Sequence, residues 1–251
     1  MIYLIGDTHG HIELNKLSNQ NFPEGKNLTK NDYVIILGDF GLLWKNDSTF
    51  KYWLDFLNNK NYTILFIDGN HENFNMLNEY PIEEWNGGKI HKISPNIYHL
   101  MRGQVFTINN KKFFTFGGAS SIDKLQRTEN IDWWRDELPT YNEMNEGFDN
   151  LEKNNFEVDY ILTHTCSSHT INDLYKNSSN LLNNTSLSTM TKNNLEKFYN
   201  SQIKEFDIAN KYFDEIKALT KFKHWYFGHF HMDLNLNHSE TIIYKQFTKI
   251  E

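Results

Sequence analysis

Five short apolar runs in this sequence each end directly at a cluster of Asp, Asn or His residues. The runs cover residues 2–5, 33–37, 62–67, 158–162 and 224–227. Their near-continuous, β-rich character predicts strands that are buried on both faces. Stretches of helical length at residues 12–19 and 48–59 lie between the first three runs, and this alternation indicates parallel βαβ units. We therefore expect a parallel α/β framework whose strand ends carry polar side chains.

Further strands and helices are expected around this framework. Short β-like runs follow at residues 89–93, 97–100, 104–108 and 112–116, with Asn109 and Asn110 as a hairpin turn between the last two. A helix is expected over residues 140–154, because Glu143 stands three residues after Thr140 and can complete a capping box. Two closing strands are expected at residues 234–236 and 241–247.

Polar residues set the predicted limits of the remaining helices. Ser48 is expected to cap the helix at residues 48–59. Residues 177–194 are rich in Asn, Ser and Thr, which predicts a loop or mobile cap, and a helix near residues 195–219 follows. Because we find no internal repeat and no clear linker, we expect a single α/β domain over residues 1–251, with residues 177–194 as a possible insertion.

Charge and cysteine content narrow the class of protein. The formal net charge of −7 argues against a general nucleic-acid binder, which normally carries a basic face. The single cysteine, Cys166, excludes an intramolecular disulfide and fits a reducing compartment. The N-terminus lacks the pattern of a signal peptide, and no stretch reaches the roughly 18 apolar residues that a membrane helix needs. We therefore expect a cytoplasmic protein with no membrane partner.

The polar residues at the ends of the five runs are of metal-ligand types. In chain order they are Asp7, His9, Asp39, Asn70, His71, His164, His229 and His231. The carboxyl ends of parallel strands meet at one edge of a sheet, where ligands bind. A single Asp or His after a strand is more often a turn former or a structural group, but five such strand ends together favour a metal site. Oxygen and imidazole donors without a thiolate suit Mn, Fe, Co or Zn.

The order of these motifs resembles that of the calcineurin-like metallophosphoesterase superfamily. The matching segments are Asp7-x-His9, Gly38-Asp39, Gly69-Asn70-His71-Glu72, His164 and Gly228-His229-x-His231. The resemblance implies a four-layer αββα sandwich that holds two metal ions, commonly Mn or Fe and sometimes Zn. It assigns Asp7, His9 and His231 to one ion, and Asn70, His164 and His229 to the other. Asp39 would bridge the two ions, and His71 would act beside the substrate as a proton donor or an oxyanion partner.

Such a site predicts a metal-dependent phosphoesterase. Two divalent ions about 3.5–4 Å apart lower the pKa of a bridging water and neutralise phosphoryl oxygens. We therefore expect hydrolysis of phosphate mono- or diesters, with Mn as the first expected metal. The substrate would be a phosphorylated small molecule, a nucleotide or a phosphoprotein. The alternatives are a Ser/Thr protein phosphatase-like activity, a nuclease and a non-catalytic binding module. Protein phosphatases carry an Arg before Gly-Asn-His-Glu, where this chain has Asp68.

A few residues outside the motifs have weaker claims to a function. Arg127 and Arg102 are candidates for contact with substrate phosphate, because the guanidinium fork fits phosphate oxygens. Trp133 and Trp134 are better explained by packing than by stacking on a base. Substrate specificity would come from residues 117–136 and 177–194, in which we find no recognisable code, and the sequence does not indicate an oligomeric state.

Overall fold

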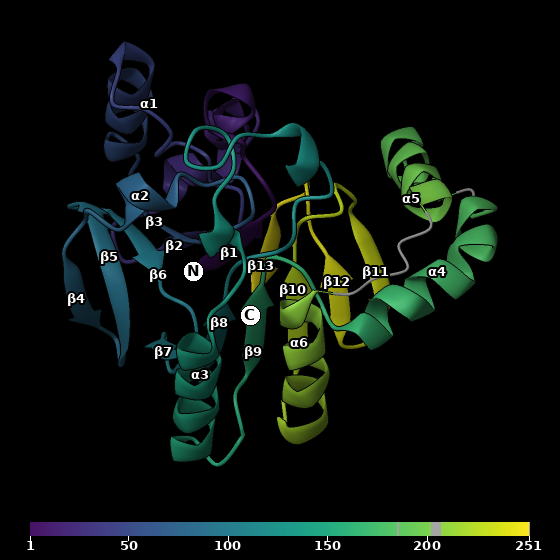
Figure 1. Ribbon diagram of the computed structural model, residues 1–251. Helices are drawn as coiled ribbons and strands as arrows, with labels where there is room; N and C mark the ends of the chain where they lie inside the picture. The colour runs from purple at the N-terminus through teal and green to yellow at the C-terminus, as the bar shows by residue number, and fades with distance from the viewer. Residues whose placement is uncertain (185, 202–206, 251) are drawn as a thin grey trace.

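Two mixed sheets form the centre of the protein (Figure 1). The computed structural model describes residues 1–184, 186–201 and 207–250. Within these residues the first sheet has seven strands, in the order β13 (Thr248–Ile250), β1 (Ile2–Ile5), β2 (Tyr33–Leu37), β3 (Thr63–Ile67), β6 (Ile97–Leu100), β5 (Gly88–Ser94) and β4 (Ile82–Trp85). The second described sheet has six, in the order β11 (Leu234–Asn237), β12 (Glu240–Ile242), β10 (His224–Phe227), β9 (Tyr160–Thr163), β8 (Lys111–Phe116) and β7 (Gln104–Ile108).

The strands that precede the predicted ligands are parallel neighbours. In the first sheet β2 pairs in parallel with both β1 and β3, and in the second sheet β9 pairs in parallel with β10. The strand ends are level, since Ile5 lies beside Ile36 and Phe227 beside Thr163. The predicted ligands therefore come from the carboxyl ends of parallel strands in both sheets.

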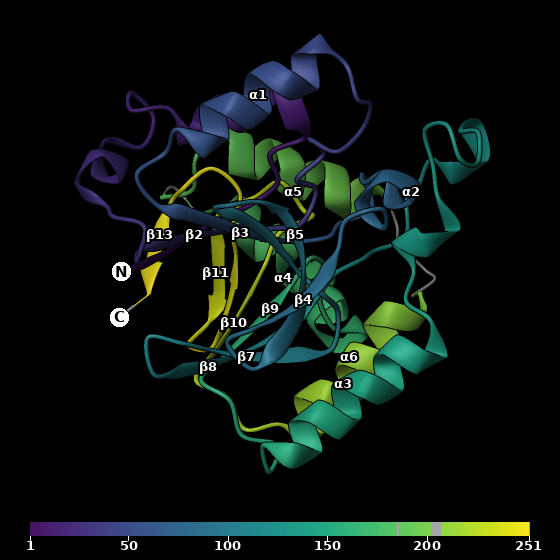
Figure 2. The same cartoon turned by 90° about the vertical axis from the view of Figure 1, so that its left-hand side faces the viewer.

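Helices cover the outer face of each sheet (Figure 2). α1 (Ser48–Asn58) and α2 (Phe74–Leu77) pack on the first sheet. α3 (Tyr141–Lys153) and α6 (Ile208–Leu219) pack on the second. The buried apolar residues accordingly fall into three clusters, one under each helical layer and one between the sheets, which includes Leu37 and Leu162. This confirms the predicted four-layer αββα sandwich.

Several local predictions are confirmed. Asn109 and Asn110 form the turn between β7 and β8, with φ values of 51° and 62° that match the left-handed backbone of a tight hairpin. Thr140 and Glu143 form a capping box at the start of α3. Trp134 is buried and packs edge to face against Trp44.

Two helical predictions near the N-terminus are wrong in detail. Residues 12–19 do not form an α-helix but two 3₁₀ turns, Gly10–Ile12 and Leu14–Leu17. The buried Leu14 and Leu17 stand three residues apart, which is the repeat of a 3₁₀ turn. Helix α1 is capped by Asp47 and not by Ser48, because the Asp47 carboxylate accepts a hydrogen bond from the N–H of Phe50 at 3.0 Å.

The polar segment at residues 177–194 is not a loop. α4 (Ser168–Leu182) and α5 (Thr189–Ser201) occupy most of it and lie side by side at one end of the molecule (Figure 1). Apolar residues at helical spacing, such as Ile171 and Leu174, anchor α4, and they outweigh the modest helix propensity of Asn and Ser. The predicted helix at 195–219 is divided between α5 and α6, and its residues 202–206 lie outside the described residues, as does residue 185 of the predicted loop.

The two edge strands of the first sheet and the strands near the C-terminus were the least predictable elements. The expected strand at residues 241–247 is shorter, because β12 ends at Ile242, and the chain then reaches β13, which pairs antiparallel with β1. β4 has three exposed residues and was not predicted. None of the described helices combines the length and the apolar character that crossing a membrane requires.

Candidate metal centre

The ends of β1, β2 and β10 bring four possible ligands into one cluster. Asp7 and His9 follow β1, Asp39 follows β2, and His231 follows β10. One ligand atom of each residue lies within 4.8 Å of the ligand atoms of the other three. His231 Nε2 is 2.9 Å from Asp7 Oδ2, and His9 Nε2 is 3.3 Å from Asp39 Oδ2. These side chains could converge on a single metal ion.

A second group of donors adjoins the other oxygen of Asp39. His164, which follows β9, has its Nε2 atom 3.1 Å from Asn70 Oδ1 and 3.3 Å from Asp39 Oδ1. The ring of His229 lies beside that of His164, with 5.0 Å between the centroids. Asp39 therefore presents Oδ2 to His9 in the first group and Oδ1 to His164 in the second. A carboxylate in this position can belong to two coordination shells at once.

Hydrogen bonds orient the donor atoms of the second group. His164 Nδ1 is 2.8 Å from the carbonyl oxygen of Leu37, and since a carbonyl only accepts, Nδ1 carries a proton and Nε2 faces the cluster. Asn70 Nδ2 donates to Ser121 Oγ at 3.1 Å, which turns Asn70 Oδ1 toward His164. Ser121 Oγ in turn donates to the buried Glu137 at 2.6 Å. Ser121 lies in the segment of residues 117–136 that was expected to contribute to specificity, whereas no sequence motif singled out Glu137.

Glycines next to the ligands allow the strand ends to approach one another. Gly38 has a φ of 87°, and a Cβ atom there would lie 2.1 Å from His164 Nδ1. A Cβ atom on Gly69 would lie 2.1 Å from Asp39 Oδ1. Any side chain at either position would displace a possible ligand, which explains the glycines in these two motifs.

Four of the predicted ligands have a left-handed backbone themselves. Their φ values are 45° for His9, 47° for Asp39, 66° for His229 and 51° for His231. This conformation costs of order 1 kcal/mol for a residue with a side chain and is concentrated at functional sites. The turns also aim backbone donors at the cluster, because His229 N–H donates to Asp7 Oδ1 at 3.0 Å and His71 N–H donates to Asp39 Oδ1 at 2.7 Å.

Glu72 fixes the turn that carries Asp39. Its buried carboxylate accepts hydrogen bonds from the N–H groups of Phe40 at 2.7 Å and Gly41 at 3.0 Å. Burial and the neighbouring charge of Asp39 raise the pKa of Glu72 to about 8. The last residue of the Gly-Asn-His-Glu motif therefore supports the cluster without entering it.

Sequence analysis missed two residues that support His9 and His231. Glu13 Oε2 is 3.5 Å from His9 Nδ1, and the hydroxyl of Tyr244 donates to Glu13 Oε1 at 2.8 Å. The Tyr244 ring stacks on that of His231, with 4.7 Å between centroids and 11° between planes. The spacing of four residues between His9 and Glu13 was the available signal for Glu13, whereas nothing in the sequence singled out Tyr244.

The negative charge of the cluster raises the pKa of two of its histidines, His9 and His164. Burial opposes a charge on His9, but hydrogen bonds to Asp39 and Glu13 outweigh it and raise the pKa of His9 to about 10. Burial likewise opposes a charge on His164, and the negative charge of Asp39 raises its pKa to about 9. Burial alone would raise the pKa of Asp39, yet His164 and His9 hold it well below its ordinary value. For His229, burial and the charge of His164 lower the pKa to about 3.

The residues of the cluster fit a divalent cation. Asp7 Oδ2 is buried and, among the residues that the structure describes, receives no well-aligned hydrogen bond, although His231 Nε2 is 2.9 Å away. A bound cation would satisfy this oxygen and would replace the protons on His9 and His164. The donor set of carboxylate, amide and imidazole groups suits Mn, Fe, Co or Zn.

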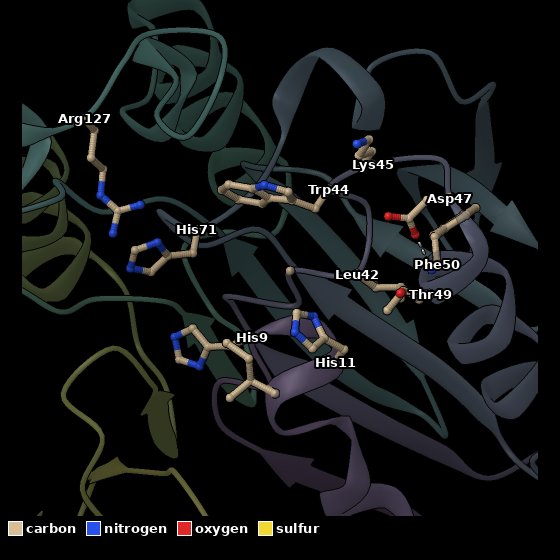
Figure 3. A pocket seen from close by; sticks show the side chains of 12 residues that line it. His9, His11, Leu42, Trp44, Lys45, Asp47, Thr49, Phe50, His71 and Arg127 are labelled. Atoms are coloured by element: carbon tan, nitrogen blue, oxygen red, sulfur yellow. Dashed lines mark hydrogen bonds between the residues drawn. The ribbon is translucent and has the colours of Figure 1, made fainter.

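Two of the predicted substrate-facing residues line one cavity beside the cluster (Figure 3). His71 shares this cavity with His9, and 5.6 Å separates their ring centroids. Arg127 lines it too, and Asp123 holds the guanidinium by accepting from Nε and Nη2, each at 2.8 Å. Burial lowers the pKa of His71. Both side chains are therefore within reach of a molecule that fills the cavity.

Arg102 does not line that cavity, which corrects its expected role as a phosphate contact. Its Nε and Nη2 atoms donate to Asp68 Oδ2 at 2.9 Å and 2.6 Å, and Nη2 also donates to the carbonyl of Asp136 at 2.7 Å. Asp68 and Arg102 are both buried, and the charge of Arg102 holds the pKa of Asp68 down against the effect of burial. Arg102 is therefore a structural counter-ion for the carboxylate that precedes Gly69.

Replacing Arg102 with Leu is expected to destabilise the fold by about 3–5 kcal/mol, because it removes the guanidinium that neutralises the buried carboxylate of Asp68 and leaves only His99 beside it. Denaturant unfolding of the wild type and the variant measures the loss. Arg135→Leu is the matched control, since Arg135 pairs with Glu129 at the surface and its loss should change stability little. Equal effects of the two substitutions would contradict the structural role of Arg102.

Comparison with known families agrees with this geometry. The sequence profile of the calcineurin-like phosphoesterases matches residues 1–233, a range that includes every predicted ligand from Asp7 to His231. The chain belongs to the calcineurin-like phosphoesterase family. As a calcineurin-like phosphoesterase it is a metal-dependent enzyme of the class that hydrolyses phosphate esters. No curated protein matches this phosphoesterase significantly.

Proposed function

We propose that this phosphoesterase hydrolyses phosphate mono- or diesters with two divalent transition-metal ions, of which Mn is the first choice. Asp7, His9 and His231 would bind one ion, and Asn70, His164 and His229 would bind the other, with Asp39 between them. The observation that carries the proposal is the position of Asp39, whose two oxygens each lie 3.3 Å from a histidine nitrogen of a different donor group.

Hydrolysis of a phosphate ester requires a nucleophile and neutralisation of the negative charge on the phosphoryl oxygens. Two ions bound in this way would supply a hydroxide near neutral pH and would neutralise the phosphoryl oxygens. His71 would donate a proton to the leaving oxygen, and the charge of a bound phosphate would favour its protonated form against the effect of burial. Arg127 uses three of its five N–H donors on Asp123 and Asp132, so the others can bind a phosphate oxygen.

A non-catalytic module of the same fold is the main alternative. A module that has lost its catalytic function would lack some of the ligands or the proton donor. Here the seven ligand positions and His71 all carry the expected residue types, and Ser121, Glu72 and Glu13 support them. These supporting contacts favour a working hydrolase over a binding module.

The purified protein is expected to contain two transition-metal ions per chain and to lose turnover of p-nitrophenyl phosphate when a chelator removes them. Elemental analysis and a rate measurement on the same sample test both points, and added Mn should restore the rate. Full turnover by metal-free protein in chelator would refute a metal-dependent mechanism. One ion per active chain would refute the role of Asp39 as a bridge.

A further inference from the structure

The cavity beside the metal centre is larger than a phosphate group needs. Its volume is about 530 Å³, which falls in the range of pockets that bind whole small molecules. His9 and His71 stand at one end of it, so a molecule that fills it would touch both the metal centre and the proposed proton donor (Figure 3). The rest of the cavity is thus available to the organic part of a phosphate ester.

The walls beyond His71 are mainly apolar and include an aromatic ring. Trp44, Leu42, Phe50 and Ile12 line the cavity, and Ile12 is 70% exposed. Exposing an isoleucine and part of a tryptophan to water in one cavity is unfavourable. Covering these side chains with an apolar ligand is favourable. This lining favours a substrate whose leaving group is organic and partly apolar.

Trp44 is held in position as a stacking surface. The buried ring of Trp134 meets it edge to face, with 5.1 Å between centroids and 85° between planes. The backbone carbonyl of Trp44 also accepts a hydrogen bond from Asn73 Nδ2 at 2.9 Å. A ring that is fixed in this way can stack on a planar ligand without losing much side-chain freedom.

Polar groups stand at the end of the cavity away from His71. Lys45, Asp47 and Thr49 line it there (Figure 3), and the Asp47 carboxylate also caps α1 through the N–H of Phe50. An amine, a carboxylate and a hydroxyl can pair with donors and acceptors on the edge of a heterocycle. Lys45 and Thr49 are exposed to water, and a nucleobase would offer them additional hydrogen-bond partners that a purely hydrocarbon ring could not.

We infer that the substrate is a nucleoside monophosphate, with its phosphate at the metal centre and its base stacked on Trp44. The inference rests on the proposed function, because it requires a phosphate ester to be cleaved beside His9 and His71. The ribose would span the distance between the two ends of the cavity. Stacking on an aromatic ring tolerates any base, so Trp44 would provide affinity for nucleotides in general.

Adenosine 5′-monophosphate and ribose 5-phosphate test this inference, because in both the leaving oxygen is the primary 5-hydroxyl of a ribose and only the nucleotide carries a base. With Mn-loaded protein, kcat/KM for the nucleotide should exceed that for the sugar phosphate by about 5- to 100-fold, the range that stacking of one base gives. Trp44→Ala should bring this ratio close to one, and Trp44→Phe should retain most of it. Tyr52→Ala is the matched control, since Tyr52 is an exposed aromatic residue of α1 that does not line the cavity, and it should leave the ratio unchanged.

The possible outcomes separate the inference from the proposed function. If neither ester nor p-nitrophenyl phosphate is hydrolysed, the proposed function fails. If p-nitrophenyl phosphate is hydrolysed but the two ribose esters react equally, the function stands and the nucleotide inference is overturned. A base preference that survives Trp44→Ala would overturn the role of Trp44, and a higher kcat/KM for phosphotyrosine than for the nucleotide would overturn the substrate class.

Discussion

Asp39→Asn is expected to lower turnover by more than about 10³-fold, which exceeds the 10²–10³ that removal of a single stabilising donor usually costs. The substitution keeps the size of the side chain but gives it one acceptor oxygen in place of two. An NH₂ group would then face either His9 or His164, so only one donor group could keep its contact with an oxygen. The backbone N–H of His71 would also compete for that oxygen.

The comparison that tests this uses His231→Asn, which removes a proposed terminal ligand at the rim of the cluster. Metal content and kcat/KM for p-nitrophenyl phosphate are measured on both variants with saturating Mn. Asp39→Asn should weaken metal binding at both positions, because the shared negative charge is lost even where an oxygen contact remains, and His231→Asn should weaken it at one. Near-normal metal content in Asp39→Asn, or a larger loss in His231→Asn, would show that Asp39 is not the bridge.

His71→Ala is expected to lower turnover by about 10²–10⁴-fold, the usual contribution of a positioned proton-transfer group, and to leave the metal content unchanged. The structure explains this separation, because His71 contacts Asp39 through its backbone N–H, which alanine retains. The imidazole lies on the wall of the cavity. Its loss should therefore affect the leaving group more than the ligands.

Two substrates distinguish the possible roles of His71. The loss should be smaller for p-nitrophenyl phosphate than for an alkyl phosphate, because nitrophenolate needs no proton in order to leave. Equal losses on both substrates would indicate that His71 stabilises charge and does not transfer a proton. Loss of metal in His71→Ala would instead make it a ligand.

The convergence of the proposed ligands was predictable because its signal is local. Each of the five apolar runs forms a strand in the structure, and a polar residue after a parallel strand must lie at its carboxyl edge. Asp39 and His164 are 125 residues apart, yet the position of each at its own strand end was enough to bring them together.

Apart from Glu13, the residues that orient the proposed ligands were not predictable, because no fixed sequence spacing links them to their partners. Tyr244 stacks on His231 after the two strands β11 and β12, and Ser121 reaches Asn70 from the loop after β8. Helix α4 and the start of α5 were missed for another reason, since packing outweighed the polar composition of residues 177–194. Asn194 of α5 donates to the carbonyl of His231 at 2.6 Å, so this region supports the turn that carries a proposed ligand.

The proposed ligands come from both sheets. The packing of the core between the sheets therefore sets the separation of the two donor groups. Leu37 and Leu162 pack in that core, and each stands two residues before a proposed ligand. Close-packed interiors transmit small changes of volume, and a displacement of about 1 Å can cost 10²-fold in rate. A methyl group gained or lost between the sheets would therefore change the separation of the two donor groups without touching either. In a random mutant library, substitutions that change the catalytic rate of this enzyme should therefore occur in the apolar core between the sheets as well as around the cavity.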